Sequence, residues 1–182
     1  MVTESKIMKQ LIVIEGPDYA GKTTLVGGIL KKKNIYQHKH AAHKNFKTEK
    51  EHHLKIDKQA EIDYFKTLEY YKTIDYPILM DRFFISSIVY PRVYNRIYDT
   101  AYVKASDWSR LKLIFVSINN RKEIAKRMKN REDLLNLDIN RIVSLDNEYR
   151  KAFKQLNFPF LEIDGSEEFE LKIEKVMEYI NE

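Results

Sequence analysis

The sequence has no cysteine, no long hydrophobic run and no internal repeat. Without cysteine there is no disulfide, thiolate nucleophile or cysteine-ligated zinc, which is compatible with a reducing cytoplasm, the location we expect. No apolar run approaches the roughly 18 residues that a membrane-spanning helix needs, and the polar start MVTESKIMKQ is not typical of a signal peptide. We therefore expect neither a membrane protein nor an obviously secreted one.

The composition predicts one folded domain. Of the 182 residues, 43% are hydrophobic, which is enough to bury a core, and no low-complexity tract or linker divides the chain. We expect a single domain over residues 1–182. The 32 Lys and Arg residues against 27 Asp and Glu give a net charge of +5, which favours phosphate-bearing partners, whether nucleotides or polymers.

Short apolar runs alternate with stretches of helical periodicity. Strands are expected at Gln10–Glu15, Ile35–Ala42, Tyr76–Phe83, Leu111–Ile118 and Phe158–Ile163. Helices are expected from Lys22 to the polar stop at Lys31–Asn34, at Lys55–Thr73, Arg121–Lys129 and Ile139–Leu156, and from Phe169 to Ile180. This alternation predicts an α/β fold in which a five-stranded parallel sheet has helices on both faces.

The segment GPDYAGKT, residues 16–23, fits the phosphate-loop pattern GxxxxGK[ST] and lies between an expected strand and an expected helix. Its backbone N–H groups and the helix N-terminus attract phosphate, Lys22 reaches the β- and γ-phosphates, and Thr23 offers an oxygen to Mg²⁺. The sequence therefore predicts a P-loop fold that binds ATP. The residues expected to line the nucleotide are Gly16, Asp18, Tyr19, Ala20, Gly21, Lys22, Thr23 and Thr24.

A second motif, Asp81-Arg82-Phe83, ends the third expected strand. The carboxyl ends of parallel strands border the ligand crevice, so Asp81 is expected beside the phosphate loop, holding Mg²⁺ through water. Arg82 can clamp a second phosphate with its planar fork. Because neighbouring side chains on a strand point to opposite faces, we expect Arg82 to turn away from the metal and serve the acceptor.

Two segments carry a family resemblance. EGPDYAGKTTL, residues 15–25, resembles the EGxDGxGKTTL opening of thymidylate kinases, and DRFFISSIVY, residues 81–90, resembles their DRYxxSSxAY segment. The resemblance implies a P-loop kinase fold, phosphoryl transfer from ATP to a deoxynucleoside monophosphate, and commonly a homodimer. It implies acceptor contacts from Asp18, Arg82, Ser86, Ser87 and Tyr90, and an adenine-side loop at Asp164 and Gly165.

The sequence also departs from that family. Thymidylate kinases usually carry arginines after the second strand and on the next helix to grip the acceptor phosphate and read thymine, but no arginine lies between Lys22 and Arg82. In their place stands QHKHAAHKNF, where Lys39 or Lys44 can act as a point charge. We therefore expect the protein to accept more than one pyrimidine.

Three arginines follow the fourth expected strand: Arg121, Arg127 and Arg131. Arg127 and Arg131 are four residues apart and share a helix face, so both can swing onto the transferring phosphoryl group when a lid closes. The thymidylate kinase resemblance places lid arginines here, which predicts a lid around residues 121–137. The alternative is a solvated basic face.

The stretch from residue 31 to residue 65 leaves several roles open. His38 and His40 would share one face of a strand, but no carboxylate completes a zinc-binding pattern. The lysines of residues 31–58 fit a solvated face better than a nucleic-acid surface, because few aromatic residues lie among them. On the long expected helix, Phe65 has the spacing of a core residue, whereas Tyr64 is a candidate to stack on a base.

Three functions are compatible with these motifs. A kinase for dTMP or a related deoxypyrimidine monophosphate needs charge neutralisation more than a base, and its catalytic candidates are Lys22, Asp81, Arg82, Arg127 and Arg131. A kinase for a hydroxyl, in a nucleoside or at a polynucleotide 5′ end, would need a carboxylate base, for which Asp18 or Glu51 is available. The third is a non-catalytic nucleotide-binding protein, which the intact P-loop with Asp81 disfavours.

Overall fold

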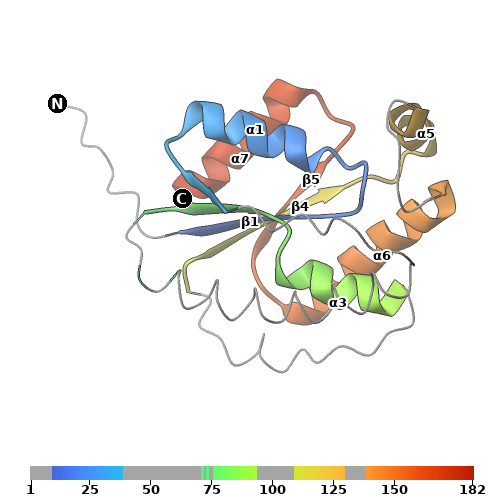
Figure 1. Ribbon diagram of the computed structural model, residues 1–182, viewed down its shortest axis with the longest axis horizontal. Helices are drawn as coiled ribbons and strands as arrows, with labels where there is room; N and C mark the ends of the chain where they lie inside the picture. The colour runs from blue at the N-terminus through green and yellow to red at the C-terminus, as the bar shows by residue number, and fades with distance from the viewer. Residues whose placement is uncertain (1–9, 39–70, 72, 74–75, 94–108, 130–137) are drawn as a thin grey trace, which may run out of the picture.

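Five parallel strands form one sheet in the order β2-β3-β1-β4-β5 (Figure 1). The computed structural model describes residues 10–38, 71, 73, 76–93, 109–129 and 138–182. The parallel sheet predicted from the sequence is confirmed. Its strands are β1 Leu11–Glu15, β2 Tyr36–His38, β3 Ile78–Asp81, β4 Leu111–Ser117 and β5 Phe160–Asp164.

Helices cover both faces of this sheet, with α1 and α7 on one side and α3 and α6 on the other (Figure 1). The predicted helix Lys55–Thr73 falls almost wholly on residues outside the described part of the chain. The described helices are α1 Lys22–Lys32, α3 Phe84–Val93, α5 Arg121–Lys129, α6 Ile139–Leu156 and α7 Phe169–Asn181.

The central strand β1 is buried on both faces because its alternate side chains enter two different hydrophobic clusters. Ile12 and Ile14 pack with residues of α1 and α7. Leu11 and Val13 pack with residues of α3 and α6. This is the expected result for a parallel strand that reads as a continuous apolar run. This packing fixes β1 in the middle of the sheet, with its carboxyl end next to the loop that begins at Gly16.

Helix α3 has no counterpart among the elements expected from the sequence. Its sequence FISSIVYPRV is apolar on several sides and contains Pro91, so it lacks the 3.6-residue alternation that marks a surface helix. Phe84, Ile85 and Val89 are fully buried against the sheet and α6. Tertiary packing, rather than periodicity, therefore accounts for this helix.

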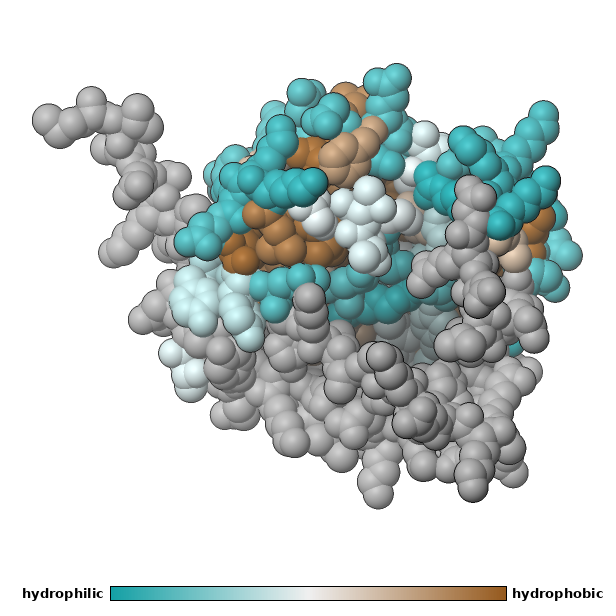
Figure 2. All heavy atoms as spheres, turned by 45° about the horizontal axis from the view of Figure 1, so that its top comes forward, coloured by the Kyte–Doolittle hydropathy of each residue, from teal (hydrophilic) through white to brown (hydrophobic). Residues whose placement is uncertain are grey.

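One face of the described part of the protein carries many polar side chains. Figure 2 shows hydrophilic side chains dominating one face, with hydrophobic ones gathered in smaller patches. Within the described ranges, no helix combines the length and the apolar character needed to cross a membrane.

Candidate functional site

The loop between β1 and α1 has the backbone of a phosphate-binding loop. Gly16 and Gly21 have positive φ angles of 145° and 95°, and Tyr19 has a φ of 63°. A Cβ atom on Gly16 would lie 2.2 Å from the carbonyl oxygen of Val116 on β4, so only glycine fits there. Helix α1 begins at Lys22 without a side-chain cap, which leaves its first N–H groups available to an anion.

Lys22 lies inside this loop, with 6% of its surface exposed. Its Nζ donates a hydrogen bond to the carbonyl oxygen of Pro17 at 2.6 Å. Burial, aided by the nearby charge of Arg82, lowers the pKa of Lys22 to about 7, although the carboxylates of Asp18 and Asp81 oppose this shift. An anion bound beside Lys22 would therefore favour the protonated, charged form of its amine.

Thr23 and Asp81 meet at the edge of the cavity, where α1 begins and β3 ends. The Thr23 hydroxyl donates to Asp81 Oδ2 at 3.0 Å. Hydroxyl and carboxylate oxygens suit Mg²⁺, which usually binds one or two protein groups together with substrate phosphates. Nowhere in the described ranges does a group of three or more His, Asp or Glu side chains form a metal site. The two oxygens therefore fit a nucleotide-bound Mg²⁺ better than an ion held by protein alone.

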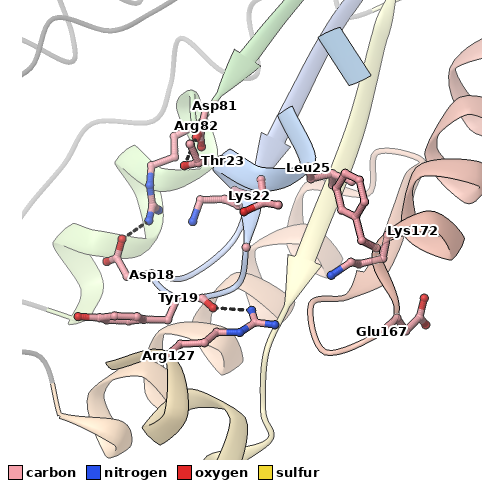
Figure 3. A pocket seen from close by; sticks show the side chains of 13 residues that line it. Asp18, Tyr19, Lys22, Thr23, Leu25, Asp81, Arg82, Arg127, Glu167 and Lys172 are labelled. Carbon is pink, nitrogen blue, oxygen red and sulfur yellow. Dashed lines mark hydrogen bonds and ion pairs between the residues drawn. The ribbon is translucent and has the colours of Figure 1, made fainter. Parts of the chain in front are cut away.

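Arg82 follows the last residue of β3 and has a left-handed backbone, with a φ of 68°. Strand alternation is therefore not what directs its side chain, and Asp81 and Arg82 both line the cavity. The guanidinium donates to Asp18 Oδ1 at 2.6 Å, to the carbonyl oxygen of Gly16 at 2.8 Å and to the Tyr149 hydroxyl at 2.8 Å. Two of these acceptors belong to the phosphate loop and the third to α6, and Figure 3 shows the contact with Asp18.

Asp18 is the carboxylate of the phosphate loop that faces Arg82. Burial raises the pKa of Asp18, but the charges of Arg82 and Lys22 and a hydrogen bond from Tyr90 outweigh it and lower the pKa to about 2. The Tyr90 hydroxyl donates to Asp18 Oδ2 at 2.7 Å. Asp18 is therefore ionised at neutral pH and has little tendency to accept a proton.

Glu15, which the sequence analysis did not single out, is the fully buried carboxylate beneath the site. Its Oε1 accepts hydrogen bonds from the backbone N–H groups of Phe83, Ile85 and Ser86 at 2.8, 3.1 and 3.3 Å, and its Oε2 accepts from the Ser86 hydroxyl at 2.5 Å. Burial raises the pKa of Glu15 despite these bonds. A glutamate ending an apolar strand, directly before the loop glycine, is the sequence signal that could have identified it.

The opposite wall of the cavity is formed by α5 and α7. Arg127 of α5 pairs with Glu123 and donates to the carbonyl oxygens of Tyr19 at 2.7 Å and Gly165 at 2.8 Å, so it ties the phosphate loop to the turn after β5 (Figure 3). Lys172 Nζ also donates to Gly165, at 2.9 Å. The cavity measures about 530 Å³, and the lining residues from this side that the sequence analysis missed are Glu167, Phe169 and Lys172.

The structure brings part of the predicted site together. Asp18, Tyr19, Gly21, Lys22, Thr23, Thr24, Asp81, Arg82 and Arg127 all line one cavity. Other predicted residues contact each other or the protein instead: Arg121 donates to Asn140, Asp164 accepts from Ser166, Ser86 is turned to Glu15, and Ser87 lies on α3 away from the cavity lining. Tyr64, Arg131 and the alternative base Glu51 fall outside the described residues, as do His40, Lys39 and Lys44.

No family model and no curated protein matches the chain. Solved structures do. A deoxyadenosine kinase from M. mycoides with bound dATP superposes with a TM-score of 0.75 at 23% identity, covering 95% of this chain and 100% of that one. The same kinase with the products dCMP and dCDP gives a TM-score of 0.72 at 23% identity, with coverages of 94% and 99%.

A third solved structure, the YorR protein from Bacillus subtilis in complex with phosphorylated GDP, gives a TM-score of 0.68 at 17% identity. The superposition covers 94% of this chain and 96% of that one. At these identities the likeness concerns the fold, and it extends over nearly the whole length of each protein. The chain has the fold of the P-loop nucleoside kinases.

Proposed function

We propose that this protein is a kinase that transfers the γ-phosphoryl group of ATP to a deoxynucleoside monophosphate, with dTMP or dUMP as the first candidates. The observation that carries the proposal is one cavity in which a phosphate loop and an oxygen pair suited to Mg²⁺ face a fixed arginine. In the reaction, the bond between the γ-phosphorus and the β,γ-bridging oxygen breaks. A bond to an oxygen of the acceptor phosphate forms, and ADP leaves.

On the donor side, the phosphate-loop N–H groups and Lys22 would hold the β- and γ-phosphates. Thr23 and Asp81 would hold Mg²⁺, which supplies neutralisation of phosphate charge when it is bound. These assignments rest on the uncapped N-terminus of α1, the buried amine of Lys22 and the contact between Thr23 and Asp81. The donor half of the site thus consists almost entirely of preorganised charge and N–H groups.

On the acceptor side, Arg82 has the geometry to grip a phosphate, because a guanidinium can bind two phosphate oxygens at once. A hydroxyl acceptor would instead call for a carboxylate that takes up its proton. Asp18 is held ionised with a low pKa by Arg82, and both oxygens of Glu15 already accept hydrogen bonds. This favours an acceptor that is already ionised, as a monophosphate is.

A hydroxyl acceptor is the second candidate function, and the structural likeness to a deoxyadenosine kinase favours it. The related structure with dCMP and dCDP as products fits both chemistries, because dCMP arises when a nucleoside accepts phosphate and dCDP when a monophosphate does. For this chain the second candidate would give Glu15 or Asp18 the role of proton acceptor.

The experiment that separates the candidates measures ATP turnover with matched acceptor pairs. Thymidine and dTMP, deoxyuridine and dUMP, and deoxyadenosine and dAMP are compared at equal concentrations, with Lys22→Ala as the control for phosphate-loop chemistry. We expect faster reaction with the pyrimidine monophosphates and a loss of about 100-fold or more in the control. Faster reaction with the nucleosides would establish the second candidate, and turnover unchanged in Lys22→Ala would refute the phosphate-loop assignment.

The further roles suggested by the resemblance to thymidylate kinases belong to the same proposal. They are a lid around residues 121–137 that carries Arg127 and Arg131, a homodimer, and a place in nucleotide biosynthesis in the cytoplasm. Light scattering after gel filtration measures the mass of the assembly and thus tests the dimer. Deletion of residues 130–137 should lower kcat while ATP still binds.

A further inference from the structure

We infer that Tyr149 of α6 is a positioning residue that aims the Arg82 fork at the acceptor, through a chain of hydrogen bonds that ends on Glu15; the inference rests on the proposed function. Tyr149 does not line the cavity, so it would act on the reaction only through Arg82. Tyr149 belongs to neither of the two sequence motifs, and the proposed binding of ATP does not explain the hydrogen bonds of its hydroxyl.

Tyr149 lies in a hydrophobic cluster, where packing alone does not require a hydroxyl group. Tyr149 is fully buried, and its ring stacks on Phe115 of β4, with centroids 6.0 Å apart and an interplanar angle of 20°. The neighbouring Phe153, on the same side of α6, shows that a phenyl ring suffices for packing in this cluster. The hydroxyl of Tyr149 lies 2.8 Å from Arg82 Nη1 and 2.8 Å from Ser86 Oγ. It also lies 3.5 Å from Glu15 Oε2.

The hydrogens of this chain can be assigned in order. Arg82 can only donate, so the Tyr149 oxygen accepts from it. The Ser86 hydroxyl gives its hydrogen to the Glu15 carboxylate, which leaves the Ser86 oxygen to accept from Tyr149. The direction therefore runs from Arg82 through Tyr149 and Ser86 to Glu15, and each hydroxyl donates once and accepts once.

Each link in this order depends on the previous one. If the phenol hydrogen pointed neither to Ser86 nor to the more distant Glu15 carboxylate, it would oppose the Arg82 N–H group across a 2.8 Å contact. Burial raises the pKa of Tyr149, so the phenol keeps its hydrogen over the working pH range. The buried carboxylate of Glu15 thus fixes, through Ser86, the orientation of the Tyr149 hydroxyl. The oxygen of that hydroxyl in turn holds Nη1 of Arg82.

Arg82 needs such support because its backbone is in the left-handed region, which is unfavourable for a residue with a side chain. Its guanidinium also lies over the ring of Tyr90 on α3, 5.1 Å from the ring centroid. The two other hydrogen bonds described for its side chain go to the phosphate loop, namely to Asp18 and the carbonyl oxygen of Gly16. That loop also holds the donor nucleotide in the proposed function. Tyr149 is the contact that α6 contributes, and it ties the acceptor-side arginine to the rigid core rather than to the donor loop.

The test compares Tyr149→Phe with Tyr179→Phe, a tyrosine of α7 whose hydroxyl donates to the backbone carbonyl of Pro159 at 3.5 Å and has a further backbone hydrogen bond with Leu113. With the acceptor that wild type uses, we expect Tyr149→Phe to lower kcat/KM for the acceptor by about 10- to 100-fold, the scale of a small misplacement of a reacting group. The KM for ATP should change by less than about twofold. Tyr179→Phe should leave both unchanged.

A second readout does not need turnover. Selective isotope labelling of arginine allows NMR to follow rotation of the Arg82 guanidinium, and we expect faster rotation in Tyr149→Phe than in wild type. If Arg82 rotates in Tyr149→Phe as it does in wild type, and kcat/KM falls equally for ATP and for the acceptor, the inference is overturned and Tyr149 has a purely structural role. If wild type transfers phosphate to no acceptor, the proposed function fails; faster rotation would then still support the positioning role of Tyr149, and unchanged rotation would overturn that too.

Discussion

Binding of ATP should draw a proton onto Lys22. In the free protein, burial and the charge of Arg82 lower the pKa of this amine to about 7 from an ordinary value of 10.5. Triphosphate oxygens beside the amine favour its charged form and should raise its pKa back toward the ordinary value. By mass action, uptake should be about 0.9 proton per ATP bound at pH 8, about 0.5 at pH 7 and about 0.1 at pH 6.

Isothermal titration calorimetry measures this uptake when the same titration is repeated in buffers with different heats of ionisation. Lys22→Met removes the titrating group and keeps most of its volume, so the uptake at pH 8 should fall to the level set by the nucleotide itself. Lys172→Gln is the matched control, because Lys172 is another cavity lysine whose pKa burial lowers. It should retain most of the uptake.

Uptake that is absent at pH 8, or that is the same in wild type and Lys22→Met, would refute the placement of this amine against the phosphates.

The sign of the effect of pH on stability provides an independent check. Because the folded protein binds fewer protons at Lys22 than the unfolded chain does between pH 7 and 10.5, the free energy of unfolding should rise with pH across that window. Lys22→Met should remove this rise.

Four further substitutions test other parts of the site. Arg82→Lys keeps the charge but loses the fork, so steady-state kinetics should show a KM for the acceptor raised about 10-fold with little change for ATP; the reverse pattern would place Arg82 on the donor side. Asp81→Asn should shift the Mg²⁺ dependence of the rate to higher concentrations, and an unchanged Mg²⁺ titration would exclude Asp81 as a ligand. Arg127→Ala should lower kcat more than ATP affinity if this arginine meets transition-state charge, whereas equal losses of both would leave it only the structural role of joining Tyr19 to Gly165. Gly28→Ala puts a Cβ atom 2.4 Å from an α7 side chain, whereas the Cβ of Gly27→Ala meets nothing within 4 Å. Urea denaturation should therefore find Gly28→Ala about 1–3 kcal/mol less stable than Gly27→Ala. Equal stabilities would show that α7 can shift to make room for the added methyl group.

The fold was predictable because its signals are local. The strands β1 and β4 are apolar runs bounded by polar residues, and both α5 and α6 have the bounds that their periodicity predicts. Strand β5 was expected two residues too early, since Phe158 is apolar but packs at the edge of the core before the strand begins. Helix α3 was missed because it is buried on several sides.

The candidate site was predictable where a motif carries its own geometry. The phosphate loop and the pair Asp81 and Arg82 lie where the strand-to-loop order predicts. Glu15 and Tyr149 were not identified as site residues, because their importance depends on partners far away in the sequence. The role of a glutamate at the end of a strand, or of a tyrosine on the buried face of a helix, becomes visible only when the fold places it close to Arg82.

The strand order has a consequence for how the chain reaches this fold during synthesis. Strand β1 is made first, but its two neighbours are β3 and β4, and the pair of β1 with β4 joins Leu11 to Leu111. Until β4 has left the ribosome, β1 can pair only with β3 on one edge, and its other edge lacks a partner. Pairing over such long separations is slow and leaves the nascent chain open to aggregation. Chains truncated before residue 111 should therefore require a chaperone to stay dispersed, whereas those that extend through α6 should not.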